Sequence, residues 1–224
     1  MATYKHLPRG KKKPVKDEFI DWTIKVIHFL HVHVKTISIA AGAFFITLVV
    51  IFSANYFLKY RENKIANSFY QIQEVTNKEE KIVELKKFVA DYSDSETGRV
   101  ASLELANILF ETKQYEAAIA EFERISQKKS YPVLVRIAGF YGLANVLLAQ
   151  EKYEQAAQTY IVAAEVNHNL NKADSFYQAG LCFEKLADYA KAKEYFEKAL
   201  DLTQEGQLKN KIEEHLLWLI AQGR

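Results

Sequence analysis

Three histidines near the N-terminus are the first residues of this chain whose types and spacing could do chemistry. His28 and His31 are three residues apart, so they share one face of a helix, and His33 follows closely. Neutral imidazole is a common metal ligand. However, no carboxylate or thiolate is spaced to complete a tetrahedral site with them. We therefore predict no metal centre and interpret the three side chains as facing lipid headgroups.

A cysteine is the second candidate for chemistry. Cys182 is the only cysteine of the chain, which excludes an intrachain disulfide, and it lies between two apolar residues. A catalytic thiol needs a neighbouring base. Beyond the N-terminal region the chain has only His168 and His215, which lie in distant segments. We expect Cys182 to be a small apolar core residue.

Other catalytic patterns are missing from the sequence as well. The glycines form no phosphate-binding run, and Asp and Glu are scattered beside Lys as on solvated helix faces. We predict no catalytic residue, no cofactor and no enzymatic activity. A redox or metal enzyme would require the His cluster or Cys182 to bind a group, which metal analysis of the purified protein would detect.

A short pattern that recurs three times indicates the elements that position these residues. Each copy has an aromatic residue, an alanine three residues later and a second aromatic four residues after that. The copies are Tyr115/Ala118/Phe122, Tyr153/Ala156/Tyr160 and Tyr189/Ala192/Phe196, whose first tyrosines are 38 and 36 residues apart. This spacing is close to the roughly 34-residue period of a helix–turn–helix repeat. The helix-length segment before each copy has a small residue, Ala106, Ala144 or Gly180, where two helices would approach closely.

On these residues the chain resembles the tetratricopeptide repeat family over residues 98–202. The resemblance implies an all-α fold, an α-solenoid of about three to four helical hairpins. One amphipathic helix would carry the same stripe, but three copies at near-equal spacing favour repeats. Lys78 to Tyr92 has apolar residues at helical spacing, which indicates a degenerate first repeat or an N-terminal cap. Gln207 to Gln222 is expected to be a C-terminal capping helix, although its apolar side could instead hold a partner or a second copy.

The second informative feature is an uncharged run before the repeats. No charged residue occurs between Lys35 and Lys59, and a membrane-spanning helix needs about 20 apolar residues. We predict a single transmembrane helix over 36–58. A cleaved signal peptide is disfavoured because the small residues Ser53 and Ala54 follow the bulky Phe52. A buried helix of a soluble protein is the remaining alternative.

Charge is distributed unevenly on the two sides of this run. Residues 1–35 contain eight basic and three acidic residues, whereas residues 59–224 contain 22 basic and 25 acidic residues. The positive-inside rule places the N-terminus in the cytoplasm and the repeats in the periplasm, so we expect a single-pass protein of the inner (cell) membrane. Contact with anionic lipid explains the basic tail better than contact with ribosomal RNA, so nucleic acid is an unlikely partner.

These observations predict four segments. Residues 1–35 form a basic cytoplasmic tail with an amphipathic juxtamembrane part, and residues 36–58 form the transmembrane helix. Residues 59–97 form a linker helix and the degenerate first repeat. Residues 98–224 hold the tetratricopeptide repeats and the cap.

The repeat register predicts which side chains of the first helix in each hairpin line an inner groove. These partner-binding residues are Leu103, Asn107, Phe110, Tyr141, Asn145, Leu148, Tyr177 and Leu181. Rings and amides at these positions suit an extended, partly apolar polypeptide. Leu103 and Tyr141 stand where carboxylate-clamping repeats need Lys or Arg, which puts such clamping in doubt. Packing of some of these side chains against a neighbouring helix is an equally weighted alternative.

The complete layout resembles the YfgM family of bacterial inner-membrane proteins. The resemblance rests on the segment Phe19 to Phe29, the uncharged run to Leu58, and Phe88 to Tyr92 leading into Ala101 to Phe110. It implies a periplasm-facing ancillary component of the Sec translocon that works with a membrane-anchored chaperone on emerging polypeptides. The long N-terminal segment with three histidines departs from the family pattern, so partners on that side could differ.

An adaptor for envelope assembly or cell division is the alternative function, since Ala90 to Ser95 followed by repeats also resembles periplasmic coordinators of wall synthesis. Those proteins are usually soluble or trimerise through a coiled coil. This chain lacks sustained heptads, which favours the translocon interpretation. The sequence leaves the clients and the oligomeric state open, and a homo-oligomer is possible.

Overall fold

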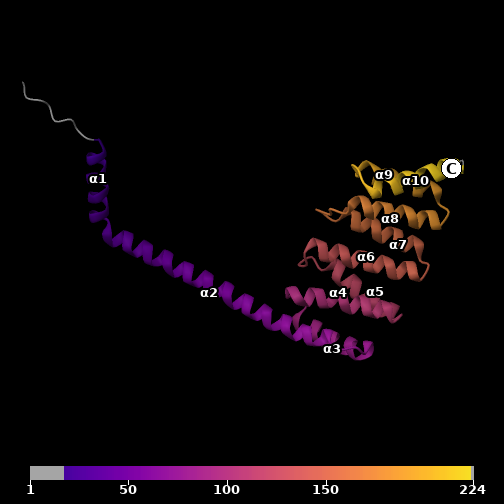
Figure 1. Cartoon of the computed structure of the whole chain (residues 1–224), viewed down its shortest axis with the longest axis horizontal. Helices are drawn as coiled ribbons and strands as arrows, with labels where there is room; N and C mark the ends of the chain where they lie inside the picture. Colours follow the sequence, from indigo (N-terminus) through magenta and orange to yellow (C-terminus); the bar gives the residue numbers. More distant parts are fainter. Residues whose placement is uncertain (1–17, 223–224) are drawn as a thin grey trace, which may run out of the picture. The chain divides into compact units, whose positions relative to one another are not determined.

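The computed structural model describes residues 18–222, and this part of the chain contains helices and no strand (Figure 1). The ten helices are α1 Glu18–Val32, α2 Val34–Gln73, α3 Lys78–Tyr92, α4 Glu96–Glu111, α5 Tyr115–Gln127, α6 Val133–Ala149, α7 Tyr153–Glu165, α8 Lys172–Lys185, α9 Tyr189–Asp201 and α10 Gln207–Ala221. The predicted all-α class is confirmed. The basic tail predicted over the first residues lies outside the described part.

The chain divides into two compact units, Met1–Lys59 and Tyr60–Arg224. In the first unit, a single residue, His33, separates α1 from α2. The helical hydrogen bonds continue through this junction, because the His33 amide donates to the Phe29 carbonyl at 3.0 Å and the Ile37 amide donates to the His33 carbonyl at 2.9 Å. The four segments predicted from the sequence stay predictions.

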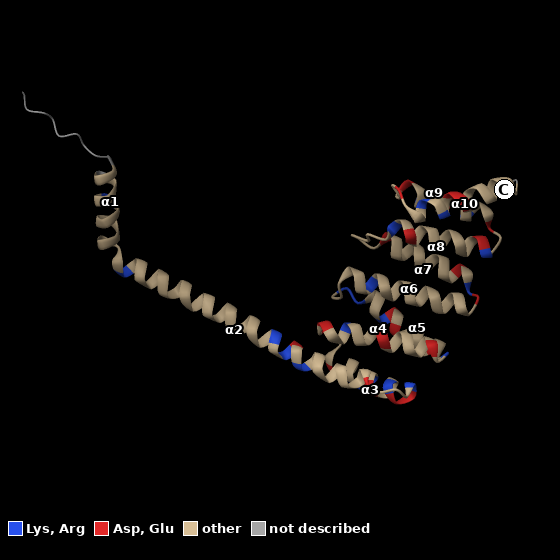
Figure 2. Cartoon of the chain, in the orientation of Figure 1, with Lys and Arg blue, Asp and Glu red and all other residues tan. Residues whose placement is uncertain are grey.

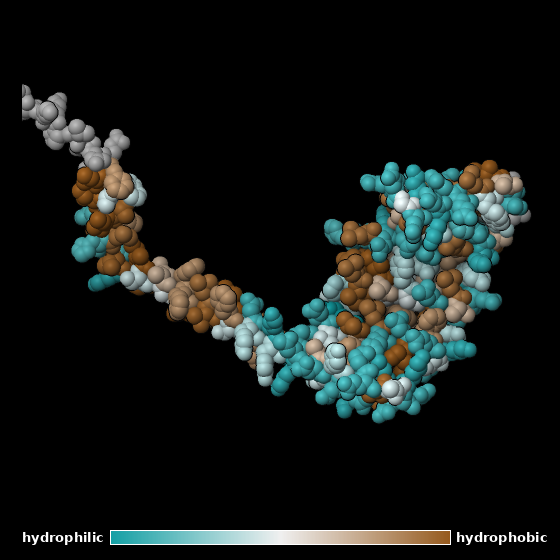
Figure 3. Space-filling view, viewed as in Figure 1, coloured by the Kyte–Doolittle hydropathy of each residue, from teal (hydrophilic) through white to brown (hydrophobic). Residues whose placement is uncertain are grey.

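Within residues 18–222, α2 is the single helix long and apolar enough to cross a membrane, judged by length and composition. Its apolar stretch buries no side chain within the protein. Figure 2 shows no charged residue along this stretch, and Figure 3 shows it as a hydrophobic surface. Neither Pro nor Gly interrupts residues 59–73, and the same helix continues to Gln73.

The second unit is a stack of helical hairpins. The pairs α4–α5, α6–α7 and α8–α9 are the three predicted repeats, and each helix packs mainly on its neighbours in the chain. The last turns of α2 and α3 precede them, and α10 follows and packs on α9. The predicted solenoid of three to four hairpins with a C-terminal helix is therefore confirmed.

The recurring sequence pattern forms the core of this stack. Ala118, Ala156 and Ala192 are fully buried, and the second aromatic of each copy is buried as well. A Cβ at Gly180 would lie 2.6 Å from the ring of Phe196, so only a residue without a side chain fits there. The small residues thus permit the close helix approach that the sequence predicts.

Each hairpin has the same three-residue turn, whose middle residue has a left-handed backbone. The φ angles are 60° at Lys113, 57° at Glu151 and 57° at Ala187. In the first turn the Gln114 amide donates to the Leu109 carbonyl at 2.8 Å, and equivalent bonds close the other two turns. This bond pattern satisfies the carbonyls at the end of the first helix. The hairpins therefore share one geometry, and equivalent side chains take equivalent places.

Candidate partner-binding surface

Burial fixes the register of the first helices in the three hairpins. Leu109 of α4, Leu147 of α6 and Phe183 of α8 are buried and stand 38 and 36 residues apart. Two residues before each of them come Asn107 and Asn145, which are exposed, and Leu181, which is half-buried. We call the side of the first helices that carries these three residues the first-helix face. The sequence-predicted residues of the three hairpins are thus equivalent in the structure.

The exposure of these predicted residues varies. Asn107 and Asn145 are exposed. The apolar side chains beside them, namely Leu103, Phe110, Leu148 and Leu181, are half-buried and pack against the core. The face therefore alternates accessible amides with partly accessible apolar side chains, a combination that can bind both backbone and side chains of a polypeptide.

Tyr141 is half-buried and fully engaged by its neighbours. Its hydroxyl donates to Asp174 Oδ2 at 2.7 Å and lies 2.9 Å from Ser175 Oγ, both in α8. Its ring meets the ring of Tyr160 edge to face, with centroids 5.2 Å apart. Burial raises the pKa of the Tyr141 phenol, because a phenolate would lose its hydration. Tyr141 therefore links two consecutive hairpins.

Tyr177 lies at the equivalent place in the next hairpin but is only 7% exposed. Its ring centroid is 5.8 Å from Phe196 and 5.8 Å from His215 of α10. His215 Nδ1 in turn lies 2.8 Å from Glu184 Oε2 of α8. Tyr177 thus lies in the packing between α8, α9 and α10, which was the alternative considered for such residues.

The amide of Asn145 is oriented by the second helix of its own hairpin. The Tyr160 hydroxyl donates to Asn145 Oδ1 at 3.1 Å. The Tyr160 ring is buried, and this burial raises the pKa of its phenol. A neutral phenol keeps its proton, so Tyr160 can donate this bond and hold the Asn145 carbonyl oxygen in place.

Tyr70 is a surface residue that the predicted set did not include. It lies in α2, two residues before the buried Ile72 and 37 residues before Asn107, and it is 73% exposed. The last turns of α2 lie beside α4, since Glu62 accepts a hydrogen bond from the Thr97 amide at 2.7 Å. The 37-residue spacing was the signal that could have identified Tyr70.

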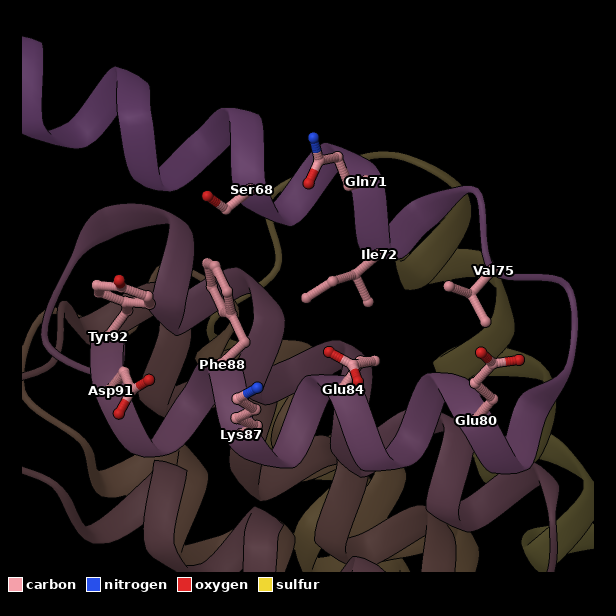
Figure 4. Close-up of a pocket in the computed structure, with 10 residues that line it drawn as sticks. All are labelled: Ser68, Gln71, Ile72, Val75, Glu80, Glu84, Lys87, Phe88, Asp91 and Tyr92. Atoms are coloured by element: carbon pink, nitrogen blue, oxygen red, sulfur yellow. The ribbon is translucent and has the colours of Figure 1, made fainter.

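A cleft of about 470 Å³ lies between the end of α2 and α3 (Figure 4). Ile72 and Phe88 point into it, and Glu80, Glu84 and Asp91 of α3 line it beside Lys87. The carboxylates all come from one helix. The Ser68 hydroxyl also lines the cleft, but it donates to the Lys64 carbonyl at 3.2 Å and no imidazole lies among the lining residues. The cleft therefore has no evident catalytic arrangement.

The residues considered for chemistry are separated in the structure. Cys182 is buried in α8, and burial raises the pKa of its thiol to about 12, so the reactive thiolate is disfavoured. His168 is exposed in the loop after α7, whereas His215 contacts Glu184. Among residues 18–222, no group of three or more His, Cys, Asp or Glu side chains is placed to hold a metal ion.

The stacked hairpins and their equivalent faces agree with a comparison to known families. The model of the family described as tetratricopeptide repeat-like domain matches residues 28–217. The chain belongs to this family. The matched region includes the apolar stretch of α2 as well as every repeat hairpin. No curated protein matches the sequence.

Several solved structures are similar to this chain. One is the MamA RS-1 ArsTM double mutant, with 18% identity, a TM-score of 0.52, and coverage of 72% of this chain and 84% of that chain. Another is pilF of Pseudomonas aeruginosa, with 23% identity, a TM-score of 0.52, and coverage of 74% and 70%. A third is a tetratricopeptide repeat protein of Parabacteroides merdae, with 14% identity, a TM-score of 0.54, and coverage of 72% and 60%. At these identities the likeness shows the fold alone.

Proposed function

We propose that this protein is a membrane-tethered scaffold whose first-helix face binds extended polypeptide. A tetratricopeptide fold is in general that of a protein–protein interaction scaffold. The observation that carries the proposal for this chain is the recurrence of exposed Asn107 and Asn145 at equivalent places, each between half-buried apolar side chains. Amides in such a row can bond to the backbone of a ligand whatever its sequence.

The tether in this proposal is α2. Its apolar stretch is long enough to span a membrane and none of it is buried within the protein, which suits a lipid environment. The family match includes this stretch, which supports its retention in the working protein. The excess of basic residues before it supports a cytoplasmic N-terminus and periplasmic repeats in an inner membrane.

The finer proposal is that the protein serves as an ancillary subunit of the Sec translocon and helps to hand translocated polypeptides to a membrane-anchored chaperone. Tethering beside a pore raises the effective concentration of emerging chains. Individually weak contacts to amides and partly buried apolar side chains would then be sufficient.

Site-specific photo-crosslinking in intact cells tests both levels of this proposal. A photoreactive residue replaces Asn107 on the first-helix face, and a control replaces the exposed Gln158 on α7, a second helix. Tyr141 is less suitable because its hydroxyl links α6 to α8. We expect adducts with translocon subunits, a membrane chaperone or nascent secreted chains at position 107 alone.

Two results would contradict the proposal. Equal adducts from positions 107 and 158 would reject the first-helix face as the binding surface. Adducts confined to wall-synthesis or division proteins would replace the translocon role by that of an envelope adaptor.

The topology is tested separately by cysteine labelling. In a Cys182→Ala background, a cysteine replaces either Ala2 or the exposed Lys129, and intact spheroplasts are treated with a membrane-impermeant maleimide. We expect position 129 to be labelled at once and position 2 only after the membrane is permeabilised. The reverse result would place the repeats in the cytoplasm.

A further inference from the structure

The C-terminal helix α10 has the register of a fifth first helix. The buried residues Ile72, Leu109, Leu147, Phe183 and Leu219 follow one another at spacings of 37, 38, 36 and 36 residues. The first four lie in helices that open hairpins, and Leu219 lies in α10. The position of its buried residue thus makes α10 the next member of this series of helices.

The same register places exposed apolar residues of α10 on the first-helix face. The places two residues before the buried residues are occupied by Tyr70, Asn107, Asn145, Leu181 and Leu217. The places one residue after them are occupied by Gln73, Phe110, Leu148, Glu184 and Ile220. Leu217 is 66% exposed and Ile220 is 62% exposed. A helix that only closes a solenoid is expected to show a polar outer face. The exposed pair on α10 departs from that expectation.

The first-helix face therefore changes character along the stack. Toward α2 it carries Tyr70 and the amides of Asn107 and Asn145. Toward α10 it carries Leu181, Leu217 and Ile220, which form an apolar end. Exposed leucine and isoleucine cost solubility unless a ligand covers them.

The charged residues on this face indicate which charge such a ligand carries. In each first helix and in α10, this face comprises the places nine, six and two residues before the buried residue of the series and one and two residues after it. Acidic side chains occupy five of these places, namely Glu74, Glu111, Asp174, Glu184 and Glu213, and a basic one occupies a single place, Lys185. Asp174 also accepts from the Tyr141 hydroxyl and Glu184 contacts His215, whereas Glu74 and Glu213 are exposed. Lys78 pairs with Glu111 at 2.8 Å, but both side chains are more than half exposed, where such a pair is weak. The face complements a cationic segment.

We propose that α10 is the apolar end of the binding surface, and that this surface takes an extended polypeptide segment containing both apolar side chains and Lys or Arg. The apolar side chains lie against Leu181, Leu217 and Ile220, and the basic ones lie near the carboxylates. This inference rests on the proposed function, since it names the class of segment that the scaffold binds.

Peptide binding to the full chain tests this inference. The protein is embedded in nanodiscs of zwitterionic lipid, and fluorescence anisotropy reports binding of a labelled Ser/Asn-rich peptide with a Leu cluster and several Lys residues. Matched peptides replace Lys by Glu or Leu by Ser, and empty nanodiscs give the lipid background. We expect the Lys/Leu peptide to bind at least about tenfold more tightly than either variant peptide.

Protein variants then locate the apolar end. We expect the double variant Leu217→Ser, Ile220→Ser to weaken binding of the Lys/Leu peptide about tenfold, because two apolar contacts are lost. A matched control replaces the exposed apolar residues of two second helices, Val83→Ser and Val162→Ser, which are 63% and 47% exposed. This control is expected to bind as the parent does.

The outcomes separate this inference from the proposed function. Loss of binding in Asn107→Arg, Asn145→Arg together with unchanged binding in the α10 variant would leave the scaffold intact and overturn the role of α10. Unchanged binding in both variants would overturn the first-helix face itself. Equal binding of the Lys and Glu peptides, or binding of neither, would overturn the cationic class.

Discussion

The hydroxyl of Tyr141 in α6 lies 2.7 Å from Asp174 Oδ2 in α8, so one hydrogen bond joins the first helices of two consecutive hairpins. The two residues are 33 positions apart in the chain. Contacts between hairpins mostly involve apolar side chains, which are non-directional. A phenol–carboxylate bond adds direction, because it fixes the offset of one helix along the other.

Loss of this bond should lower stability. We expect Tyr141→Phe to reduce the free energy of unfolding by about 1–2 kcal/mol, since the bond involves a charged acceptor that is only partly shielded from water. Denaturant titration of the full chain measures the change. Tyr70→Phe, at a largely exposed ring, should change stability by less than about 0.5 kcal/mol. If Tyr141→Phe and the parent protein are equally stable, the bond does not stabilise the fold.

Stability should also fall at alkaline pH because of two buried phenols. Burial raises the pKa of Tyr141 and of Tyr160 in the folded protein, whereas tyrosines of the unfolded chain titrate near pH 10. Above about pH 10 the unfolded state loses protons that the folded state keeps, so each tyrosine lowers stability by up to about 1.4 kcal/mol per pH unit. Below that pH neither contributes a pH dependence.

Unfolding titrations between about pH 8 and pH 11 test this sign. The variant Tyr141→Phe, Tyr160→Phe lacks both phenols and should show a shallower alkaline decline than the parent, with Tyr70→Phe as the control. A parallel decline in parent and variant would show that other groups cause it.

A glycine in the hairpin turns should stabilise the protein. Ala187 has a φ of 57°, which costs a residue with a side chain about 1–2 kcal/mol, and its side chain is exposed. Part of the gain from Ala187→Gly is offset by the extra freedom of glycine in the unfolded chain, so we expect a net gain of about 0.5–1 kcal/mol. Thermal unfolding checks it. The control Ala190→Gly, at an exposed position in the first turn of α9, should instead lose up to about 0.5–1 kcal/mol.

A methyl group at Gly180 should destabilise the third hairpin. Alanine favours a helix over glycine by about 1 kcal/mol, but a Cβ would lie 2.6 Å from the Phe196 ring, and overpacking costs about 1–3 kcal/mol. We therefore expect Gly180→Ala to lose up to about 2 kcal/mol. Combining it with Phe196→Leu should cost less than the sum of the single changes, as measured by a double-mutant cycle. Strict additivity would contradict the steric explanation.

The hairpins were predictable because their determinants are local in sequence. The pattern of Tyr115, Ala118 and Phe122 recurs at near-equal spacing, and its small and second aromatic members are buried in every copy. The start of α4 is likewise set locally, since Ser95 Oγ accepts a hydrogen bond from the Gly98 amide at 2.9 Å. The C-terminal helix was expected over Gln207 to Gln222 and is observed over Gln207–Ala221.

The surface was less predictable because it depends on contacts between hairpins. Tyr177 was placed on the groove from its register, yet His215 of α10 covers it. The apolar stripe of α10 was identifiable, since Ile212 and Leu219 are buried and Leu208 and Leu216 pack against the core. The five consecutive apolar residues from Leu216 to Ile220 did not indicate that Leu217 and Ile220 stay exposed. The link from Tyr141 to Asp174 likewise requires the stacking of α8 on α7 to be known first.

Helices of this protein pack mainly on helices that are next to them in the chain, and this has a consequence for folding during synthesis. Among the helices of the second unit, the main packing partners are consecutive helices, with α4 and α6 as the additional pair. The core of an early hairpin therefore does not depend on a segment that lies much later in the chain. Each hairpin can therefore settle on the preceding one as synthesis or export delivers it. In this order α10 follows the three hairpins, so the apolar end of the surface is completed only after all of them have emerged.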